Sequence, residues 1–438
     1  MTQVFAQDFK AAPYWWETAA PTNDSQELPD EVDFLVVGGG YTGLNAAITA
    51  QRAGISTTVV DAEPIGWGGS SRNGGQVTGG LKFGVDALTR SYGSERAHQI
   101  LQAAHAAFPF IEDLIAREQI DCDYVRSGKF VAAWSKRHYA TMEAKVDVLA
   151  KLSGHPARLV PPSQQREELA SDHYCGGYVS EAGGLLHPAK YVLELKRVAL
   201  QAGAKLAGGV QVTKITPRGT GFAVSAGGRT IRAASVLVAT NAYSDQGSRG
   251  DALPWLTRRI VPITSYMIAT EEIGEDRVKA LFPTMRAVSD TRNLLNYFRA
   301  SPDGKRILWG GRARLTETTV EFTAPILHRF MTDVIPSLKD VKLTHAWKGN
   351  VGFTFDFIPH LGKHDGIHYA AGCQGSGVAM MSWLGHNAAL EVAGRPAGTF
   401  ALADLPFPSR PGYSGRPWFL PIVGEWYRFR DFVDRRAA

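Results

Sequence analysis

The most regular pattern of apolar and polar positions lies near the start of the chain. Residues 32–37 (VDFLVV) form a short β-branched run, which predicts a buried strand. The glycine turn at 38–43 leads into the Ala-rich segment 44–53, which predicts a helix, and residues 57–61 predict a second strand. A strand, a helix and a strand in this order indicate a βαβ unit with parallel strands and a right-handed crossover.

Similar patterns divide the remainder of the chain. Apolar residues at three- and four-residue spacing predict helices over 95–120, 138–152 and 188–202. Short apolar or β-branched runs predict strands at 129–133, 210–216, 222–225 and 235–240. Strand-like pieces dominate residues 258–345, and a Gly-rich turn at 371–377 opens a predicted helix that reaches about residue 392. We therefore expect an α/β protein of two domains, each built from discontinuous segments.

The composition narrows the classes of function. Lys and Arg number 47 against 42 Asp and Glu, a formal net charge of +5 without basic blocks, so nucleic-acid binding has little support. The three cysteines, Cys122, Cys175 and Cys373, form no CxxC pair, which argues against a disulfide framework or a metal site and favours a reducing compartment. We find neither the pattern of a signal peptide nor an apolar run of about 18 residues. We expect a soluble, cytoplasmic protein without an integral membrane segment or a bound metal.

The glycine turn has the spacing of a dinucleotide-binding motif, Gly38-x-Gly40-x-x-Gly43. The first glycine permits the tight turn, the second lets backbone N–H groups approach a pyrophosphate, and the third lets helix and strand pack closely. Asp61 ends the next predicted strand, where a carboxylate would accept hydrogen bonds from an adenosine ribose. This register of strand, turn, helix and acidic residue predicts a bound dinucleotide.

A second glycine-rich loop favours FAD as that dinucleotide. Residues 67–76 (WGGSSRNGGQ) follow the second predicted strand, and their polar groups could wrap a further part of the same large cofactor. No second Gly-x-Gly-x-x-Gly lies between a predicted strand and a helix, which disfavours a pyridine nucleotide as a second ligand.

Seven segments together carry a family resemblance. They are TAAP in the N-terminal arm, VVGGGYTGLNAA, IGWGGSSRNGGQ, GLLHPAKYV, VLVATNAY, DTRNLLNYFRASPDGKRILWGGR and AGCQGSGVAMMSWLG. In their order and spacing, the chain resembles the D-amino-acid-oxidase-like (DAO) superfamily of FAD-dependent oxidoreductases, and most closely the γ-glutamylputrescine oxidoreductase branch.

The resemblance implies a Rossmann-like FAD-binding domain and a discontinuous α+β substrate-binding domain built on a mainly antiparallel sheet. The FAD-binding domain is expected to comprise residues 31–90, 183–245 and 345–400, and the substrate-binding domain residues 91–182 and 246–344. Residues 1–30 would form an irregular arm whose Tyr14-Trp15-Trp16 cluster packs on the body, and residues 401–438 a C-terminal tail.

The resemblance also implies how matching residues hold a noncovalent FAD. The glycine turn would hold the pyrophosphate, residues 70–76 would lie against the flavin ring, and the backbone of Val210 would meet the adenine. The loop 372–377 would aim the last helix at the pyrimidine edge of the ring, where a helix N-terminus stabilises negative charge. The expected cofactor-binding residues are Gly38, Gly40, Tyr41, Thr42, Gly43, Asp61, Ala62, Ser70, Ser71, Arg72, Asn73, Gly74, Gly75, Gln76, Val210, Thr240, Asn241, Gly372, Gln374, Gly375, Ser376, Gly377 and Val378.

One loop departs from the family pattern. Many relatives carry a histidine where this chain has Gln374 to Gly377, so no role is assigned to such a group. Cys373 lies beside this loop, but a free cysteine is more often a small buried hydrophobe than a point of flavin attachment. His187 is expected to be structural, and Asp356 and Pro359 to support the segment beneath the flavin.

The implied reaction is loss of a hydride from the carbon beside a neutral amine, followed by hydrolysis of the imine, which needs orientation and desolvation. Tyr297 and Arg299 share one face of a predicted strand, where they would line the amine site and pair with a substrate carboxylate, although structural packing explains them equally well. Arg72 competes as the carboxylate anchor. Lys348 is a candidate for the positive charge that assists the reaction with O2, although a solvated lysine is the simpler interpretation.

The leading prediction is an enzyme that oxidises a secondary amine, a γ-glutamyl-polyamine or an amino acid, with O2 or another acceptor taking the electrons. The alternatives are an imino-acid or N-methyl amino-acid oxidase, a dehydrogenase linked to a membrane quinone, and a flavoprotein subunit without catalysis. Residues 416–436 mix aromatic side chains with Arg and predict an amphipathic helix that packs on the body or weakly contacts a membrane surface. Its acidic residues favour packing.

Overall fold

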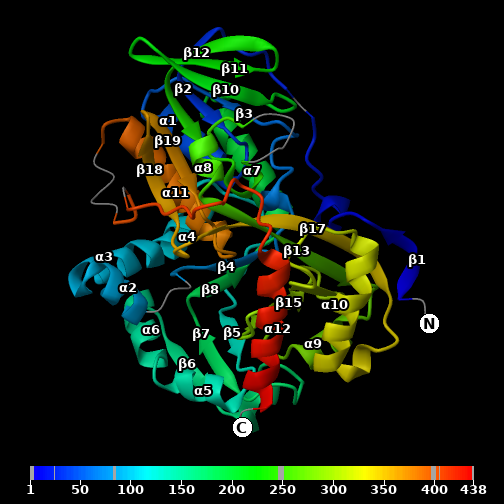
Figure 1. Cartoon of the computed structure of the whole chain (residues 1–438). Helices are drawn as coiled ribbons and strands as arrows, with labels where there is room; N and C mark the ends of the chain where they lie inside the picture. Colours follow the sequence, from blue (N-terminus) through cyan, green and yellow to red (C-terminus); the bar gives the residue numbers. More distant parts are fainter. Residues whose placement is uncertain are drawn as a thin grey trace.

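Two β-sheets organise the chain, one in the upper and one in the lower half of the view in Figure 1. The computed structural model describes residues 4–23, 25–81, 85–244, 251–395, 401–403 and 405–436. No helix among these described residues is long and apolar enough to cross a membrane.

The upper sheet has a parallel centre. Strands β19, β12, β2, β3 and β9 run parallel in that spatial order, while β10, β11 and β18 add antiparallel pairs at its margins. The strands span Glu31–Val37 (β2), Thr57–Val60 (β3), Lys205–Ala207 (β9), Val212–Arg218 (β10), Gly221–Ala226 (β11), Arg229–Val238 (β12), His360–His364 (β18) and Ile367–Ala371 (β19). This is the parallel α/β arrangement that the βαβ pattern predicts.

The continuous apolar run of β2 reflects burial on both faces. Phe34 and Val36 enter one hydrophobic cluster, whereas Leu35 and Val37 enter another on the opposite side of the sheet. A central parallel strand covered on both faces reads as apolar throughout rather than as an alternation.

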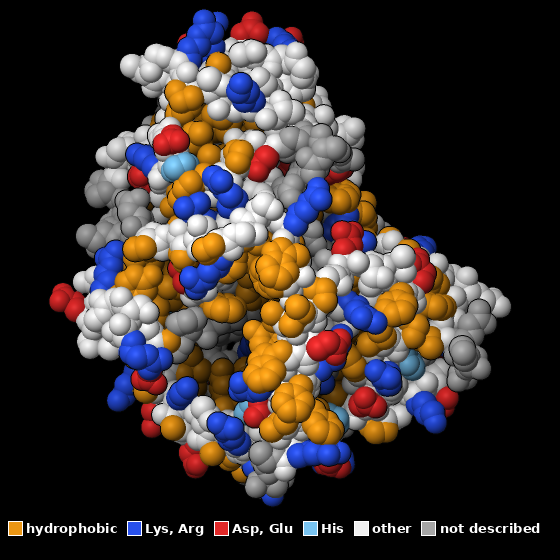
Figure 2. All heavy atoms as spheres, viewed as in Figure 1, with side chains coloured by type: hydrophobic (Ala, Val, Ile, Leu, Met, Phe, Trp, Pro, Cys, Tyr) orange, Lys and Arg blue, Asp and Glu red, His pale blue; other side chains and the backbone are white. Residues whose placement is uncertain are grey.

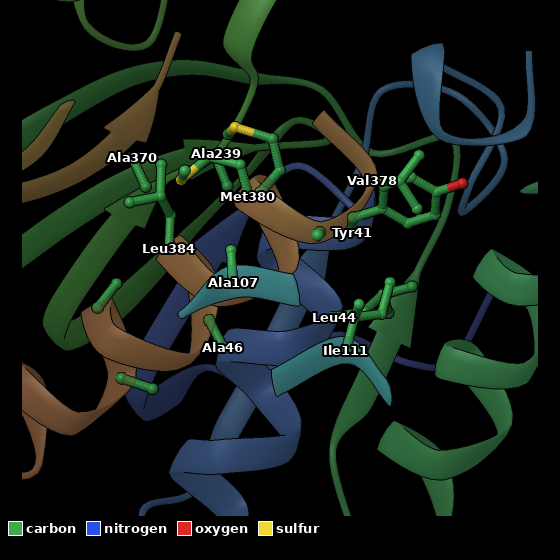
Figure 3. Close-up of a cluster of buried hydrophobic side chains, with 14 of the residues drawn as sticks. Tyr41, Leu44, Ala46, Ala107, Ile111, Ala239, Ala370, Val378, Met380 and Leu384 are labelled. Carbon is green, nitrogen blue, oxygen red and sulfur yellow. The ribbon is translucent and has the colours of Figure 1, made fainter. Parts of the chain in front are cut away.

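Several helices pack together in the first of these clusters, part of which Figure 3 shows in close-up, and four of them supply most of its helical residues. They are α1 (Tyr41–Arg52), α4 (Ala107–Arg117), α7 (Pro188–Gln201) and α11 (Gly377–Val392). A Cβ atom at Gly385 of α11 would lie 2.0 Å from the carbonyl oxygen of Thr42 in α1. The middle of α11 therefore crosses the start of α1 in direct backbone contact.

The lower sheet has nine strands and is mainly antiparallel. Its order is β1-β17-β13-β16-β15-β14-β5-β7-β6, and only the β1–β17 and β14–β5 pairs are parallel. The strands span Phe5–Lys10 (β1), Lys129–Ala132 (β5), Ala157–Val160 (β6), Gly177–Ser180 (β7), Ile260–Thr270 (β13), Ala287–Asp290 (β14), Asn296–Ala300 (β15), Ile307–Gly311 (β16) and Leu343–Thr354 (β17).

One face of the lower sheet packs in a hydrophobic core. Phe130, Phe298 and Trp309 pack there against Leu327 and Met331 of α10 (Val320–Val334). The opposite face carries Val131, Ser289 and Tyr297 side by side on β5, β14 and β15, and lines a cavity.

The remaining elements are short or lie outside the two sheets. The helices are α2 (Val85–Tyr92), α3 (Ser94–His105), α5 (Lys136–Glu143), α6 (Val146–Ser153), α8 (Pro254–Thr257), α9 (Glu275–Leu281) and α12 (Leu420–Arg436), and the strands β4 (Gln76–Thr78) and β8 (Gly183–Leu185) pair with each other. The parallel and the mainly antiparallel sheet confirm the expected fold class.

Four local expectations differ from the structure. The helix predicted over 95–120 is two helices, α3 and α4, and the helix predicted over 138–152 is also two, α5 and α6. The arm is not irregular throughout, because β1 pairs in parallel with β17 and the 3-10 helix η1 (Tyr14–Glu17) buries Trp15. The segment 345–354 belongs to the lower sheet as part of β17, rather than to the nucleotide-binding half, because β17 pairs along most of its length with β13.

Candidate functional site

The glycine turn between β2 and α1 is shaped by close backbone contacts. Gly38 has a φ angle of 111°, and a Cβ atom there would lie 2.9 Å from the carbonyl oxygen of Ala239. At Gly43 a Cβ atom would lie 1.9 Å from the carbonyl oxygen of Gly38, so only glycine lets α1 start this close to the strand. These contacts explain the first and third glycines of the motif.

The start of α1 is open to a ligand. Gly40 precedes the helix and offers no side-chain cap, and the N–H of Tyr41 donates to Ser70 Oγ at 3.1 Å. A Cβ atom at Gly40 would lie 2.8 Å from the same Oγ. The first turn of α1 and Ser70 thus form a polar cradle at a positive helix end, which is suited to an anion such as a pyrophosphate.

Asp61 follows β3 and lies beside this cradle. Its carboxylate accepts hydrogen bonds from the N–H groups of Gly39 (2.7 Å) and Glu63 (3.0 Å). Burial raises the pKa of Asp61 to about 6 despite these hydrogen bonds. The backbone therefore fixes the carboxylate at the position where the sequence predicts a ribose.

A cavity of about 1160 Å³ extends from the glycine turn to the lower sheet. This exceeds the range of about 300–1,000 Å³ that is usual for a small-molecule site. The expected cofactor-binding residues that line the cavity are Gly38, Gly40, Tyr41, Thr42, Asp61, Ala62, Ser70, Arg72, Asn73, Gly74, Gln76, Val210, Thr240, Asn241, Gly375, Ser376, Gly377 and Val378. One space thus joins the dinucleotide motif, both glycine-rich loops and the predicted substrate domain.

Five expected cofactor-binding residues do not line this cavity and instead shape its walls. Gly43 packs against Gly38, and the carbonyl oxygen of Gly75 accepts from the N–H of Leu186. Ser71 Oγ accepts from the indole N–H of Trp16 at 3.1 Å. The N–H of Gly372 donates to Asn241 Oδ1, and Gln374 Nε2 donates to Thr354 Oγ1 at 2.7 Å.

These residues fit FAD. The open first turn of α1 suits the pyrophosphate, Asp61 suits the ribose, and residues 70–76 form the wall that meets the lower sheet. Gly375 and Ser376 line the cavity directly before α11, which also has no side-chain cap. At Val210 the N–H already donates to the carbonyl oxygen of Asp61 at 2.7 Å, so the carbonyl is the backbone group left to meet an adenine.

Tyr297 lies where the loop 70–76 meets the lower sheet. Its ring packs against Gly74 and Gly310, where Cβ atoms would lie 3.0 Å and 2.2 Å from ring carbons. Its hydroxyl is 3.0 Å from Ser265 Oγ on β13, and burial raises its pKa. Tyr297 therefore lines the cavity where this loop meets the lower sheet.

Arg72 also lines the cavity, but aromatic rings hold its guanidinium. The guanidinium carbon lies 4.0 Å from the ring centre of Trp67 and 4.5 Å from that of Trp16. Its Nε donates to the carbonyl oxygen of Trp67 at 2.8 Å, and burial lowers its pKa. Arg72 is a fixed positive charge in the wall of the cavity.

Arg299 does not reach the cavity. Its guanidinium donates to the carbonyl oxygens of Leu186 (2.7 Å) and Ala300 (2.9 Å), and burial lowers its pKa to about 9. Arg299 does share a sheet face with Tyr297, but the N-terminal arm covers this end of the face. The ring of Trp15 lies 5.6 Å from the guanidinium carbon. The geometry gives Arg299 a structural position rather than that of a carboxylate anchor.

Lys348 is also outside the cavity. Lys348 pairs across strands with Tyr266 and therefore shares its face of the sheet, which is the core face turned away from the cavity. The ammonium of Lys348 donates to Glu317 at 2.7 Å and to the carbonyl oxygen of Thr318. Its neighbour Trp347 faces the site side and donates to the carbonyl oxygen of Arg72. Strand alternation thus turns Lys348 away from the place where an O2-activating charge would act.

The other singled-out residues have local partners. His187 caps α7, because its Nδ1 accepts from the N–H of Lys190 at 3.1 Å, and burial lowers its pKa to about 4. Asp356 pairs with His360 at 3.0 Å. Cys373 is a free thiol that lines the cavity, with Sγ 3.6 Å from the carbonyl oxygen of Gly352. Among the described residues, no group of three His, Cys, Asp or Glu side chains could hold a metal ion.

Sequence reasoning missed several residues of the substrate end of the cavity. They share a place on the cavity face of the lower sheet or at its margin: Lys129, Tyr178, Ser180, Ser265, Met267 and Arg312. No motif marks them, because they come from β5, β7, β13 and the end of β16, and only the pairing of the sheet brings these strands together.

Comparisons with known proteins agree with this geometry. The family model described as FAD dependent oxidoreductase (DAO) matches residues 33–390. The chain is 32% identical over 409 residues to gamma-glutamylputrescine oxidoreductase of Escherichia coli, covering 91% of this chain and 92% of that protein. It is 30% identical over 428 residues to a probable oxidoreductase OrdL of Rhizobium meliloti, covering 95% and 97%.

Solved structures share the fold at lower identity. Glycine oxidase from Geobacillus kaustophilus matches with a TM-score of 0.69 at 20% identity, covering 86% of this chain and all of that one. L-proline dehydrogenase from P. horikoshii matches with a TM-score of 0.68 at 18% identity, covering 92% and 99%.

Proposed function

Because the chain belongs to the family of FAD-dependent oxidoreductases, whose relatives oxidise amines or amino acids, we propose that its substrate is an amine of the γ-glutamyl-polyamine type. The observation that carries this proposal is the continuous cavity that runs from the dinucleotide motif to the half-buried ring of Tyr297. The name of the relative that is 32% identical over nearly its whole length supports the acylated-diamine class of substrate.

When bound, FAD supplies a hydride acceptor for the carbon beside the amine nitrogen. The chain's own residues orient the amine and keep water away. Tyr297 is held by Ser265 and wedged against Gly310, so its ring forms a rigid wall. Met267 lies beside it on β13 and also lines the cavity, so the reacting end has an apolar surface that favours the neutral amine over its charged form.

Anaerobic bleaching of the flavin band near about 450 nm tests this proposal. The purified holoprotein would be mixed with γ-glutamyl-diamines, free polyamines, N-methyl amino acids and cyclic imino acids. We expect rapid bleaching by the acylated diamines. Bleaching only by cyclic or N-methyl amino acids would instead support the imino-acid oxidase, and no bleaching by any of these compounds would contradict the proposed function.

The acceptor of the electrons has two candidates. We propose O2 as the acceptor in a reducing, cytoplasmic compartment, which the three free thiols support. A membrane quinone is the second candidate, and the outer face of α12 favours it. On that face Ile422, Trp426 and Phe429 are 70%, 54% and 57% exposed, and Figure 2 shows a row of hydrophobic side chains at the place of α12 in Figure 1.

The polarity of α12 is unusual for a surface helix. Toward the body, the carboxylate of Asp431 accepts from the backbone N–H groups of Asn293 (2.8 Å) and Leu294 (3.0 Å). Its exposed side carries Arg430 among the aromatic residues. Exposed Trp, Phe and Arg side chains on one helix face are typical of a helix that lies at a membrane interface.

Two measurements decide between the acceptors. The first is the rate at which substrate-reduced enzyme is reoxidised by air or by a soluble quinone. The second is co-sedimentation with vesicles of phosphatidylcholine and phosphatidylglycerol, comparing the wild type with an Ile422→Ser, Trp426→Ser, Phe429→Ser variant and with Phe322→Ser, a control at an exposed phenylalanine on α10. Quinone reduction with vesicle binding that only the α12 variant loses would support the quinone. Rapid reoxidation by air without vesicle binding would support O2.

A further inference from the structure

Lys129 is a lysine at the substrate end of the cavity, where it has no hydrogen-bond or ion-pair partner among the described residues. It lies at the start of β5 and lines the cavity, and burial lowers its pKa to about 8. None of the residues that the structure describes forms a hydrogen bond or an ion pair with it, and desolvation alone shifts its pKa. Lys129 is half-buried. An ammonium group that is partly removed from water is stabilised by an opposite charge, so an unpaired one that faces a cavity points to an anion supplied by a ligand.

The register of the sheet shows which way Lys129 faces. Lys129 pairs with Ser180 on β7 and Ala287 on β14, and two residues further Val131 pairs with Tyr178 and Ser289. Lys129, Val131, Tyr178, Ser180 and Ser289 all line the cavity. The intervening Phe130 and Val288 are in the core on the opposite face. The side chain of Lys129 therefore lies on the same face of the lower sheet as the ring of Tyr297.

Two hydroxyl groups accompany Lys129 on the neighbouring strand. Tyr178 and Ser180 both face this end of the cavity, and burial raises the pKa of Tyr178 to about 12, so its hydroxyl keeps its proton as a donor. Four other charged residues line the cavity near the lower sheet. Asp290 pairs with Arg292, and Arg312 donates to the carbonyl oxygen of Asn293, whereas Lys145 and Asp86 lie at the exposed rim and have opposite signs. A cation flanked by two hydroxyl donors is suited to a carboxylate.

The spacing between Lys129 and Tyr297 sets the length of the ligand. Tyr297 pairs with Ser289 on β14, and Ser289 pairs with Val131 on β5, two residues beyond Lys129. Lys129 and Tyr297 are therefore two strands and two positions apart. With strands about 4.8 Å apart and about 3.3 Å per residue, their Cα atoms are separated by roughly 12 Å. An amine whose reacting carbon lies beside Tyr297 thus reaches Lys129 only if it is extended and carries its anionic group at the far end.

We propose that Lys129, with Tyr178 and Ser180, forms a carboxylate-binding subsite that selects amines bearing a carboxylate at the end opposite the oxidised carbon. This inference rests on the proposed function, since it names the feature of the acyl group that the enzyme recognises. It also supplies the carboxylate anchor that Arg299 does not provide, at a position that no sequence motif marks.

The test uses two substrates that differ only at the far end. N-glutaryl-diaminobutane ends in a carboxylate, whereas N-pentanoyl-diaminobutane ends in a methyl group. For the wild-type holoenzyme we expect KM for the glutaryl compound to be roughly 10- to 100-fold lower, as a charge-assisted hydrogen bond predicts. Lys129→Met should raise that KM to the level of the pentanoyl compound with little change in kcat, and Lys129→Arg should retain part of the preference.

A matched control and a binding measurement keep the test decisive. Lys145→Met removes a lysine at the rim and should leave both KM values unchanged. N-glutaryl-butylamine lacks the reactive amine, and calorimetry should show it binding the wild type at least about tenfold more tightly than it binds Lys129→Met. Equal KM values for the two amines in the wild type, or an equal rise of both in Lys129→Met, would overturn the subsite.

Failure of the proposed function would look different. If neither amine is oxidised, the proposed function fails, while calorimetry with N-glutaryl-butylamine still tests the subsite. If Lys129→Met does not retain FAD, the comparison of the two substrates in the wild type and in Lys129→Arg decides in its place.

Discussion

Asp61 shows at the scale of one residue how burial couples cofactor binding to pH. Its folded pKa of about 6 means that the carboxylate form, which can accept hydrogen bonds from ribose hydroxyls, predominates only above that pH. We expect the FAD affinity of the wild-type apoprotein to fall as the pH drops from about 7 to about 5, because protons compete for the same group. Asp61→Asn should bind FAD about tenfold or more weakly near neutral pH and lose this pH dependence.

Quenching of FAD fluorescence during titration with apoprotein measures both effects. Asp33→Asn is the matched control, because Asp33 lies on β2, does not line the cavity and accepts from the N–H of Ser56. Wild-type affinity in Asp61→Asn over this pH range would mean that Asp61 does not bind the ribose.

Single residues also show which parts of the site the sequence alone could predict. The glycines and Asp61 were predictable because the chemistry of the turn is local, within about 30 residues of one βαβ unit. Arg299 and Lys129 were not, because strand alternation gives the face of a residue but not what covers that face. Trp15, far away in the sequence, lies against the guanidinium of Arg299, while Lys129 lines the cavity.

At the scale of elements, Gly310 on β16 leaves room for the ring of Tyr297, its cross-strand partner on β15. A Cβ atom there would lie 2.2 Å from the ring of Tyr297, so Gly310→Ala must displace the ring and break its hydrogen bond to Ser265. We expect at least a roughly tenfold loss of kcat/KM with FAD content retained, equivalent to about 1.4 kcal/mol of transition-state stabilisation.

A double-mutant cycle identifies the cause of that loss. In a Tyr297→Ala background the ring is gone, so adding Gly310→Ala should cost little further activity. An equal loss in both backgrounds would show that Gly310 acts through the strand itself and not through Tyr297.

The cap of α7 allows a second prediction for an element. His187 Nδ1 accepts from the N–H of Lys190, and Asn can replace this acceptor whereas Ala cannot. We expect His187→Ala to lower the free energy of unfolding by about 1 kcal/mol or more, and His187→Asn to lower it less. Urea unfolding at neutral pH measures both variants, and equal losses would mean that the contacts of the ring with Trp15 and Thr18 outweigh the cap.

At the scale of the whole molecule, buried histidines make the fold sensitive to acid. Burial lowers the pKa values of His173, His187 and His386 to about 4, against about 6.5 in an unfolded chain. Between these values the unfolded chain binds more protons than the folded one, so stability falls as the pH drops through this window. Asp61 acts in the opposite direction in the apoprotein, because its folded pKa is raised and it binds its proton more tightly in the folded state.

The three histidines lower the stability of the apoprotein on acidification, whereas Asp61 alone raises it. Together they predict a net loss of stability as the pH falls. We expect the Tm of the apoprotein to fall steadily from about pH 7 to about pH 5, and His187→Asn, which keeps the cap without titrating, to show a shallower fall. FAD should raise Tm most at neutral pH, where Asp61 is ionised and the cofactor binds only the folded chain. A Tm that stays constant over this range would show that the three histidines keep ordinary pKa values, and an unchanged slope in His187→Asn would exclude His187 as a contributor.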